Sequence, residues 1–279
     1  MEKLKENLYQ AGREPGMVNI FTLGRFLIKR DGQILTKSSV RSKKVWVLFQ
    51  YLLTHREMAI LPEAMLETLW PGKHYRDPNL AVRSLIHRLR ALFRNELDAP
   101  ELASKIVFAQ NCYRWTENGD CWLDAEEFEE FIVGAGALSN SDPRADIDLL
   151  NQANRLYLGE YLPECSSENW VLPARSYYHQ LYIKGMTRLV ELQRGVGHFS
   201  EIIDLCTKVL EIDYYEERLH LHYLEALLRE GKNKQARTHY EKMTAAFYRE
   251  MGTKPHWRCA SFTGGSALIR RAVLILIFP

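Results

Sequence analysis

Long apolar runs, paired cysteines and catalytic signatures are all missing from this sequence. No stretch approaches the roughly 20 apolar residues of a membrane-spanning helix, so we expect no membrane partner. The five cysteines form no Cys-X-X-Cys pair and lie at no zinc spacing with histidine, which favours reduced thiols and no metal site. Pro71-Gly72-Lys73 lacks the other residues of a phosphate-binding loop, and no hydrolase motif is present. We therefore expect no catalytic residues, no cofactor and no enzymatic activity.

Charge is distributed unevenly, although the net charge is only +2. Residues 1–117 carry 19 basic and 12 acidic side chains, whereas residues 118–279 carry 18 basic and 23 acidic ones. A basic first part suits a polyanionic partner, and an acidic second part suits a different kind of domain. Residues 1–10 are charged and lack an apolar core, so we expect no signal peptide and a cytoplasmic location.

The first part of the chain predicts a small antiparallel sheet, three helices and a hairpin. Residues 18–28 alternate partly, and the Asp31-Gly32 pair that follows is a strong turn signal. Apolar residues at helical spacing predict helices over 43–55, 63–70 and 79–95. Residues 105–116 predict two strands with a turn at Gln110-Asn111, since Asn tolerates a positive φ. This is the order of a winged helix, expected over 17–117 after a flexible arm over 1–16.

The second part predicts only helices, over 124–138, 144–158, 170–195, 199–211, 216–230 and 233–250. Asp124 and Glu127 have the spacing of a capping box at the first of these helices. The segments beginning at Gly197 and Gly231 repeat with the 34-residue period of tetratricopeptides, with Cys206 as a packing residue. The expected fold class is mainly α with a small β part: an N-terminal winged helix-turn-helix domain followed by an all-α tetratricopeptide-like helical-repeat domain over 122–254.

The helical pattern stops at Pro255. Residues 255–279 contain Gly264-Gly265 and end in the uncharged apolar run Ala272–Pro279. We expect an atypical tail, produced by truncation or a frameshift and dispensable for folding. The alternative is a native hydrophobic cap on the last repeat, because the ends of repeat arrays need covering.

An ordered series of motifs resembles the antibiotic-regulatory-protein (SARP) family of bacterial transcriptional activators. The series consists of Phe21–Phe26 with its Asp31-Gly32 turn, Leu69-Trp70, Leu85–Arg90, Tyr113–Trp115, Trp122–Phe128, Leu156–Pro163, Trp170 and Ala226–Glu241. The resemblance covers about residues 18–255. It implies an OmpR-like winged helix joined to a bacterial transcriptional activator domain (BTAD) of tetratricopeptide helices. The sequence departs from the family at Cys112, where the wing usually has glycine, and in the tail, which lacks a further acidic helix.

The third helix of a winged helix lies in the major groove of DNA. Arg83, His87, Arg90 and Arg94 follow one another at helical spacing, and we expect this stripe to lie opposite the apolar stripe. Base contacts are expected from Asn79, Arg83 and His87. Phosphate contacts are expected from a basic set: Arg41, Lys43, Lys44, Arg88, Arg90, Arg94 and Arg114. The alternative is a solvated helix face. Trp46, Trp70 and Trp115 are expected in the core rather than stacked on bases.

The expected function is sequence-specific DNA binding in transcription regulation, with activation the expected outcome. The winged helix would bind double-stranded promoter DNA, and the helical domain would contact RNA polymerase or a second copy of the chain. The resemblance implies a homodimer on direct repeats, associated with the bacterial nucleoid when bound. One alternative is a tetratricopeptide scaffold whose N-terminal domain binds protein, and an enzyme is a third. Salt dependence separates the first two, because affinity carried by phosphate contacts falls steeply with salt.

Overall fold

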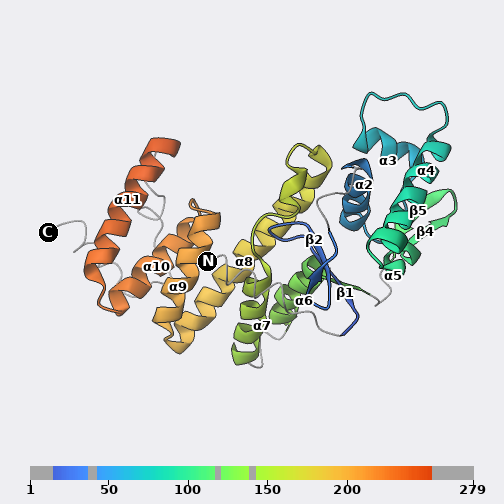
Figure 1. Cartoon of the computed structure of the whole chain (residues 1–279). Helices are drawn as coiled ribbons and strands as arrows, with labels where there is room; N and C mark the ends of the chain where they lie inside the picture. The colour runs from blue at the N-terminus through green and yellow to red at the C-terminus, as the bar shows by residue number, and fades with distance from the viewer. Residues whose placement is uncertain (1–14, 37–42, 117–120, 138–142, 253–279) are drawn as a thin grey trace. The chain divides into compact units, whose positions relative to one another are not determined.

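The computed structural model describes residues 15–36, 43–116, 121–137 and 143–252 of the 279-residue chain (Figure 1). The chain divides into two compact units. The first contains the residues up to Phe131 together with Gln152–Leu181, and the second contains Ile132–Asn151 and the residues from Tyr182 onward. The first unit is therefore larger than the winged helix expected over 17–117, because it includes the beginning of the helical segment. The tail at 255–279 lies outside the described residues.

A four-stranded sheet with the order β3-β2-β1-β6 lies in the first unit. β1 (Val18–Phe21) pairs antiparallel with β2 (Leu27–Arg30), and β2 pairs antiparallel with β3 (Gln33–Ile34). The predicted turn between β2 and β3 is confirmed, since Asp31 and Gly32 both have positive φ angles. The sequence did not predict β6 (Cys121–Leu123), which pairs parallel to β1. This fourth strand returns the chain to the sheet after the intervening helices.

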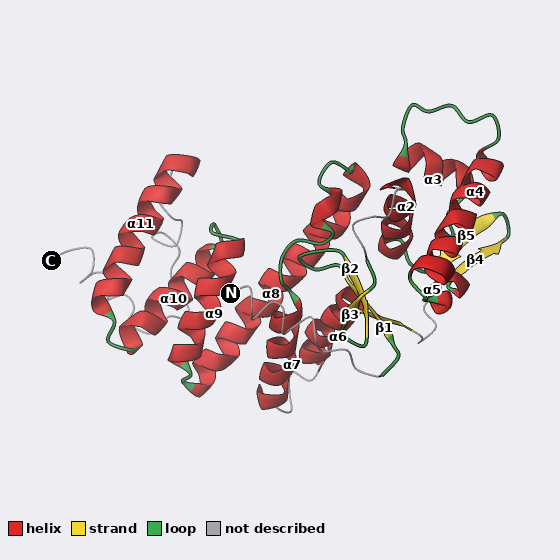
Figure 2. Cartoon of the chain, viewed as in Figure 1, coloured by secondary structure: helices red, strands yellow, loops and turns green. Residues whose placement is uncertain are grey.

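The three predicted helices and the predicted hairpin follow β3 in the expected order, and an additional short helix precedes the hairpin (Figures 1 and 2). They are α2 (Lys43–Thr54), α3 (Pro62–Leu69), α4 (Pro78–Ala91) with its π-helical extension η1 (Leu92–Glu96), the short α5 (Pro100–Ser104), β4 (Ile106–Ala109) and β5 (Cys112–Trp115). Phe49 of α2 lies at the centre of their core, with its ring 4.9 Å from that of Phe93 and 5.2 Å from that of Trp115. The expected core position of Trp115 is confirmed, while Trp46 and Trp70 are half-buried.

The hairpin β4–β5 turns at Gln110 and Asn111, whose φ angles are 51° and 61°. Two successive positive φ angles match the right-handed twist of the strands, so the hairpin closes tightly. Cys112 follows the turn and pairs with Ala109 in the β ladder. The glycine usual in the family is therefore not needed at position 112, since the left-handed residues precede it.

All six predicted helices of the second part are confirmed to within two residues at either end. They are α6 (Asp124–Ala137), α7 (Pro143–Leu156), α8 (Leu172–Val196), α9 (Phe199–Ile212), α10 (Glu217–Arg229) and α11 (Asn233–Met251). Two 3-10 turns, η2 (Pro163–Cys165) and η3 (Asn169–Val171), lie between α7 and α8. Within the second unit, α10 packs on both α9 and α11 (Figure 1).

The 34-residue period is visible in the backbone hydrogen bonds of the second unit. Before α9, the amide of Gly197 donates to the carbonyl three residues earlier, and the next amide donates to the carbonyl five residues earlier. The loop before α11 repeats both bonds at Gly231, and both glycines have φ angles in the left-handed region. Cys206 is fully buried in α9, as a packing residue should be. The predicted repeat is therefore confirmed as a repeat of local structure.

Candidate nucleic-acid interface

The start of α4 is held by its own sequence. The carboxylate of Asp77 accepts a 3.0 Å hydrogen bond from the amide of Leu80, and Pro78 occupies the first turn. An N-cap aspartate satisfies an amide that the helix leaves unpaired, and proline tolerates this position because it has no amide hydrogen. The inner face buries Val82 and Ile86 against neighbouring helices. These contacts fix which side of α4 is exposed.

The outward face of α4 consists of exposed side chains at Leu80, Arg83, Ser84, His87 and Arg88. At 100° per residue, the predicted arginine–histidine stripe lies about 80° from the direction directly opposite the buried stripe. The predicted phase was therefore wrong, although Arg83 and His87 are exposed as expected. Because the exposed face is rotated from the predicted stripe, it includes two residues that the sequence did not predict there, Leu80 and Ser84.

Arg90 is the member of the predicted stripe that does not lie on the outward face. It is half-buried, and its Nη2 atom donates a 2.7 Å hydrogen bond to the carbonyl of Ile106 at the start of β4. This bond fastens the hairpin to α4. Asn79 is also half-buried, and its Nδ2 atom donates to Glu63 of α3 at 3.4 Å. DNA contacts by Arg90 and Asn79 remain predictions, and both side chains have a partner within the protein.

The other expected phosphate ligands are distributed over three elements of the first unit. Lys43 and Lys44 are exposed at the start of α2, and the Lys44 ammonium lies 5.4 Å from the centroid of the Trp70 ring. Arg94 is exposed on η1, and Arg114 is exposed on β5 of the wing. The sequence from 78 to 95 contains four arginines and no acidic residue. Arg41 lies outside the described residues.

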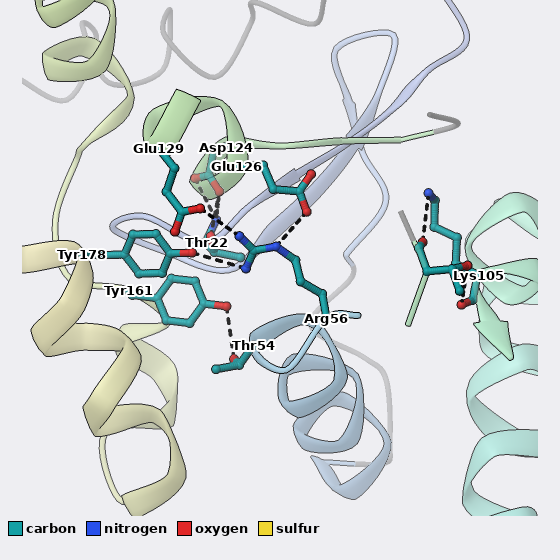
Figure 3. Close-up of polar contacts among 10 residues, drawn as sticks. Thr22, Thr54, Arg56, Lys105, Asp124, Glu126, Glu129, Tyr161 and Tyr178 are labelled. Atoms are coloured by element: carbon teal, nitrogen blue, oxygen red, sulfur yellow. Dashed lines mark hydrogen bonds and ion pairs between the residues drawn. The ribbon is translucent and has the colours of Figure 1, made fainter. Parts of the chain in front are cut away.

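A cluster of polar contacts around Asp124 joins the four-stranded sheet to α6 (Figure 3). Asp124 is buried, and its carboxylate accepts hydrogen bonds from the amide and hydroxyl of Thr22 and from the amide of Leu23, at 2.7 to 2.9 Å. Burial raises the pKa of Asp124 to about 6, although these hydrogen bonds lower it. Glu127 accepts a 2.6 Å hydrogen bond from the Trp122 indole. The carboxylates expected to form a capping box thus fasten α6 to β1 and β6.

Arg56 connects the end of α2 to α6 and α8 (Figure 3). Its guanidinium lies 2.9 Å from Glu126 and 3.2 Å from Glu129, and it donates to the Tyr178 hydroxyl at 3.4 Å. Burial lowers the pKa of Arg56, but these three groups raise it by a larger amount. Beside this cluster, the hydroxyls of Thr54 and Tyr161 lie 3.1 Å apart. Sequence reasoning missed these contacts because the partners are 70 or more residues away from Arg56 and Thr54.

Possible metal ligands do not gather anywhere in the part of the chain that the structure describes. Its histidine, cysteine and acidic side chains form no group of three or more that could hold a metal ion. Four cysteines are free thiols: Cys112, Cys121, Cys165 and Cys206. Among the helices described, none has both the length and the apolar character that a bilayer crossing requires.

Comparison with known proteins places the chain in a family. The family model for the bacterial transcriptional activator domain matches residues 123–262, half of the chain. A solved structure of Mycobacterium tuberculosis EmbR, in complex with a low-affinity phosphopeptide, has a similar fold, with a TM-score of 0.70 and 17% sequence identity. The match covers 94% of this chain but only 65% of the EmbR chain, and no curated protein sequence matches. The chain therefore belongs to the bacterial transcriptional activator domain family.

Proposed function

We propose that this regulator binds promoter DNA sequence-specifically through α4 and the β4–β5 wing, and that it activates transcription. The observation that carries the proposal is the outward face of α4, where Arg83, His87 and Arg88 are exposed on a helix without acidic residues. Arginine pairs with guanine in the major groove and also binds phosphate. Lys44 and Arg114 add exposed cations at the start of α2 and on the wing. With α4 inserted into the major groove, these cations would contact the phosphate backbones that border the groove.

The helical repeats of the second unit are proposed to contact RNA polymerase or a second copy of the chain on direct repeats. Tetratricopeptide-like repeats stack into extended surfaces that bind other proteins. The family model that matches residues 123–262 is named for transcriptional activation, which favours activation over repression. Two copies bound side by side would place two α4 helices on successive turns of the same groove.

Fluorescence anisotropy with the full chain and a labelled duplex from the native upstream region tests the DNA-binding proposal. With about five phosphate contacts, the affinity should fall about 500-fold between 50 and 200 mM salt, because each contact releases counterions. Lys44→Ala and Arg114→Ala should each lower the slope of log affinity against log salt by about one. Arg237→Ala is the matched control, because Arg237 is an exposed arginine of α11, paired with Glu241 within its own helix.

Base reading is tested separately from phosphate binding. Arg83→Ala should relax the sequence preference at one position and cost about 1–3 kcal/mol with the preferred duplex. Arg88→Ala should weaken binding to all duplexes alike. Absence of any binding at low salt would reject the proposal. A partner protein bound by the first unit, with little dependence on salt, would support the scaffold alternative instead.

A further inference from the structure

Leu80 is the one large apolar side chain on the outward face of α4, with 61% of its surface exposed. A single exposed leucine is common on protein surfaces and does not by itself indicate a function. Leu80 is distinguished by its position. It lies one helical turn before Arg83 and Ser84, on the same exposed face as the side chains that we propose to contact DNA. The hydrogen bond from its amide to Asp77 fixes the backbone from which the side chain projects. The leucine is therefore presented outward by a well-formed helix start.

We propose that Leu80 determines part of the DNA sequence preference by packing on the methyl group of a thymine in the major groove. The inference rests on the proposed function, because it assigns a base preference to the same interface. The N-terminal residues of a recognition helix contact the base edges, and thymine is the only base that presents a methyl group there. The surrounding cations Arg83 and Arg88 suit duplex DNA as the occupant of this surface, rather than an apolar protein partner.

A leucine at this position also lowers the affinity for sites that carry cytosine or adenine instead of thymine. Cytosine and adenine present amino donors in the major groove, and leucine has no polar atom to accept a hydrogen bond from them. An amino group covered by leucine would lose its water without gaining a partner, which is unfavourable. The leucine therefore favours thymine both by methyl packing and by excluding bases whose polar edge it would cover.

The spacing of Leu80 and Arg83 predicts how the preferred bases are arranged. Three residues of α-helix rise about 4.5 Å, and successive bases of one strand are about 3.4 Å apart along the DNA axis. If Arg83 pairs with a guanine, the thymine read by Leu80 lies one or two base pairs away. The predicted binding site thus contains a thymine close to the guanine whose recognition is lost in Arg83→Ala.

A methyl-deletion scan tests the inference. The full chain is used to select a preferred duplex from a random library, and each thymine is then replaced by deoxyuridine, which removes only the methyl group. At one thymine near the Arg83-dependent guanine, the wild type should lose about fourfold in affinity, the value of one buried methyl group. Leu80→Ala should bind the unmodified duplex about fourfold or more weakly and show no further loss with deoxyuridine at that position.

Two control variants test whether the effect of the thymine methyl group depends on Leu80 alone. Val133→Ala removes an exposed apolar side chain outside the first unit and should retain the full methyl effect. Arg83→Ala should relax the guanine preference while retaining the methyl effect. The inference is overturned if no deoxyuridine substitution weakens the wild type, or if Leu80→Ala remains sensitive at the same thymine, and in both cases the proposed function stands. Failure to select any duplex rejects the proposed function and the inference with it.

Discussion

Replacing Arg56 with alanine is expected to destabilise the first unit without altering the surface of α4. The guanidinium of Arg56 lies between Glu126 and Glu129 of α6 and also binds the Tyr178 hydroxyl of α8. Alanine removes the cation that neutralises these two carboxylates, and it removes the aliphatic part of a side chain that is only 16% exposed. The substitution therefore removes the charged link between α2 and the start of the helical segment.

The expected loss in the free energy of unfolding lies between the values measured for exposed ion pairs and for buried ion pairs. Removing one partner of a fully buried pair costs about 3–5 kcal/mol, whereas exposed pairs contribute about 0–1 kcal/mol. Glu126 and Glu129 are 31% and 26% exposed, so water screens them partly after the change. We therefore expect Arg56→Ala to lower the free energy of unfolding by about 2 kcal/mol. Arg56→Lys should cost about 1 kcal/mol, because an ammonium group cannot reproduce the planar geometry of the guanidinium.

Urea unfolding of the full chain, followed by circular dichroism, measures these differences. Hydrogen exchange then locates the loss, which should be largest in α2 and α6. Arg237→Ala serves as the control, because Arg237 and Glu241 are 56% and 62% exposed, and it should cost less than about 0.5 kcal/mol. A loss for Arg56→Ala no larger than that of the control would refute the argument that this cluster holds α2 to α6.

Two further predictions concern the second unit and the loop beside the sheet. His220 and His239 lie 2.8 Å apart between ring nitrogens, and burial lowers the pKa of both, to about 4 for His239. The unfolded chain therefore binds more protons between pH 6.5 and 4, so the stability present above pH 6.5 should fall by up to about 3 kcal/mol as the pH drops through this range. The difference in urea midpoint between wild type and His239→Gln, measured at pH 7.5 and 4.5, isolates this contribution; an equal difference at both pH values would contradict it. Gly24 has a φ of +101°, and a Cβ there would lie 2.9 Å from backbone and side-chain atoms of Leu158. Gly24→Ala should therefore cost about 3 kcal/mol, whereas Gly32→Ala, with a positive φ but no atom within 4 Å, should cost about 1 kcal/mol, and equal melting temperatures for the two variants would contradict the steric argument.

Local patterns in the sequence were sufficient to predict most elements of the fold. Apolar spacing placed the helices because a helix buries one stripe, and turn residues placed the β2–β3 and β4–β5 turns because these require positive φ angles. The connection between β1 and β2 was not predicted. β6 was missed because three residues carry no periodicity, and its pairing with β1 depends on a strand about 100 residues earlier. The phase of α4 was wrong because Leu85 and Ile86 fit the apolar stripe equally well in sequence. The structure buries Ile86, and the outward face turns accordingly.

The polar contacts of the first unit could not be derived from the sequence for a different reason. Arg56 and Arg90 carry charges that a local pattern assigns to solvent or to a ligand, and the local pattern assigns Asp124 to a capping box of its own helix. Their actual partners are a pair of glutamates, the end of β1 and a backbone carbonyl of the wing. Only the tertiary structure brings these groups within hydrogen-bond distance. Exposure of Arg83 and His87, by contrast, follows from the helix alone and was correctly expected.

The burial of α2 explains why the first unit extends beyond the winged helix. A helix on the surface of a small domain exposes one side, but α2 is buried on nearly all of its circumference. One side of α2 packs on α4 and β5. The other side is covered by residues that follow α7: the Tyr51 ring lies 5.4 Å from the Trp170 ring, and the Gln50 side chain accepts a hydrogen bond from the Cys165 thiol. The same helix therefore supports the proposed DNA-reading helix and the beginning of the activator domain. A fragment ending before β6 would expose this second apolar side to water, so we expect it to be less stable than the complete first unit, which includes Gln152–Leu181.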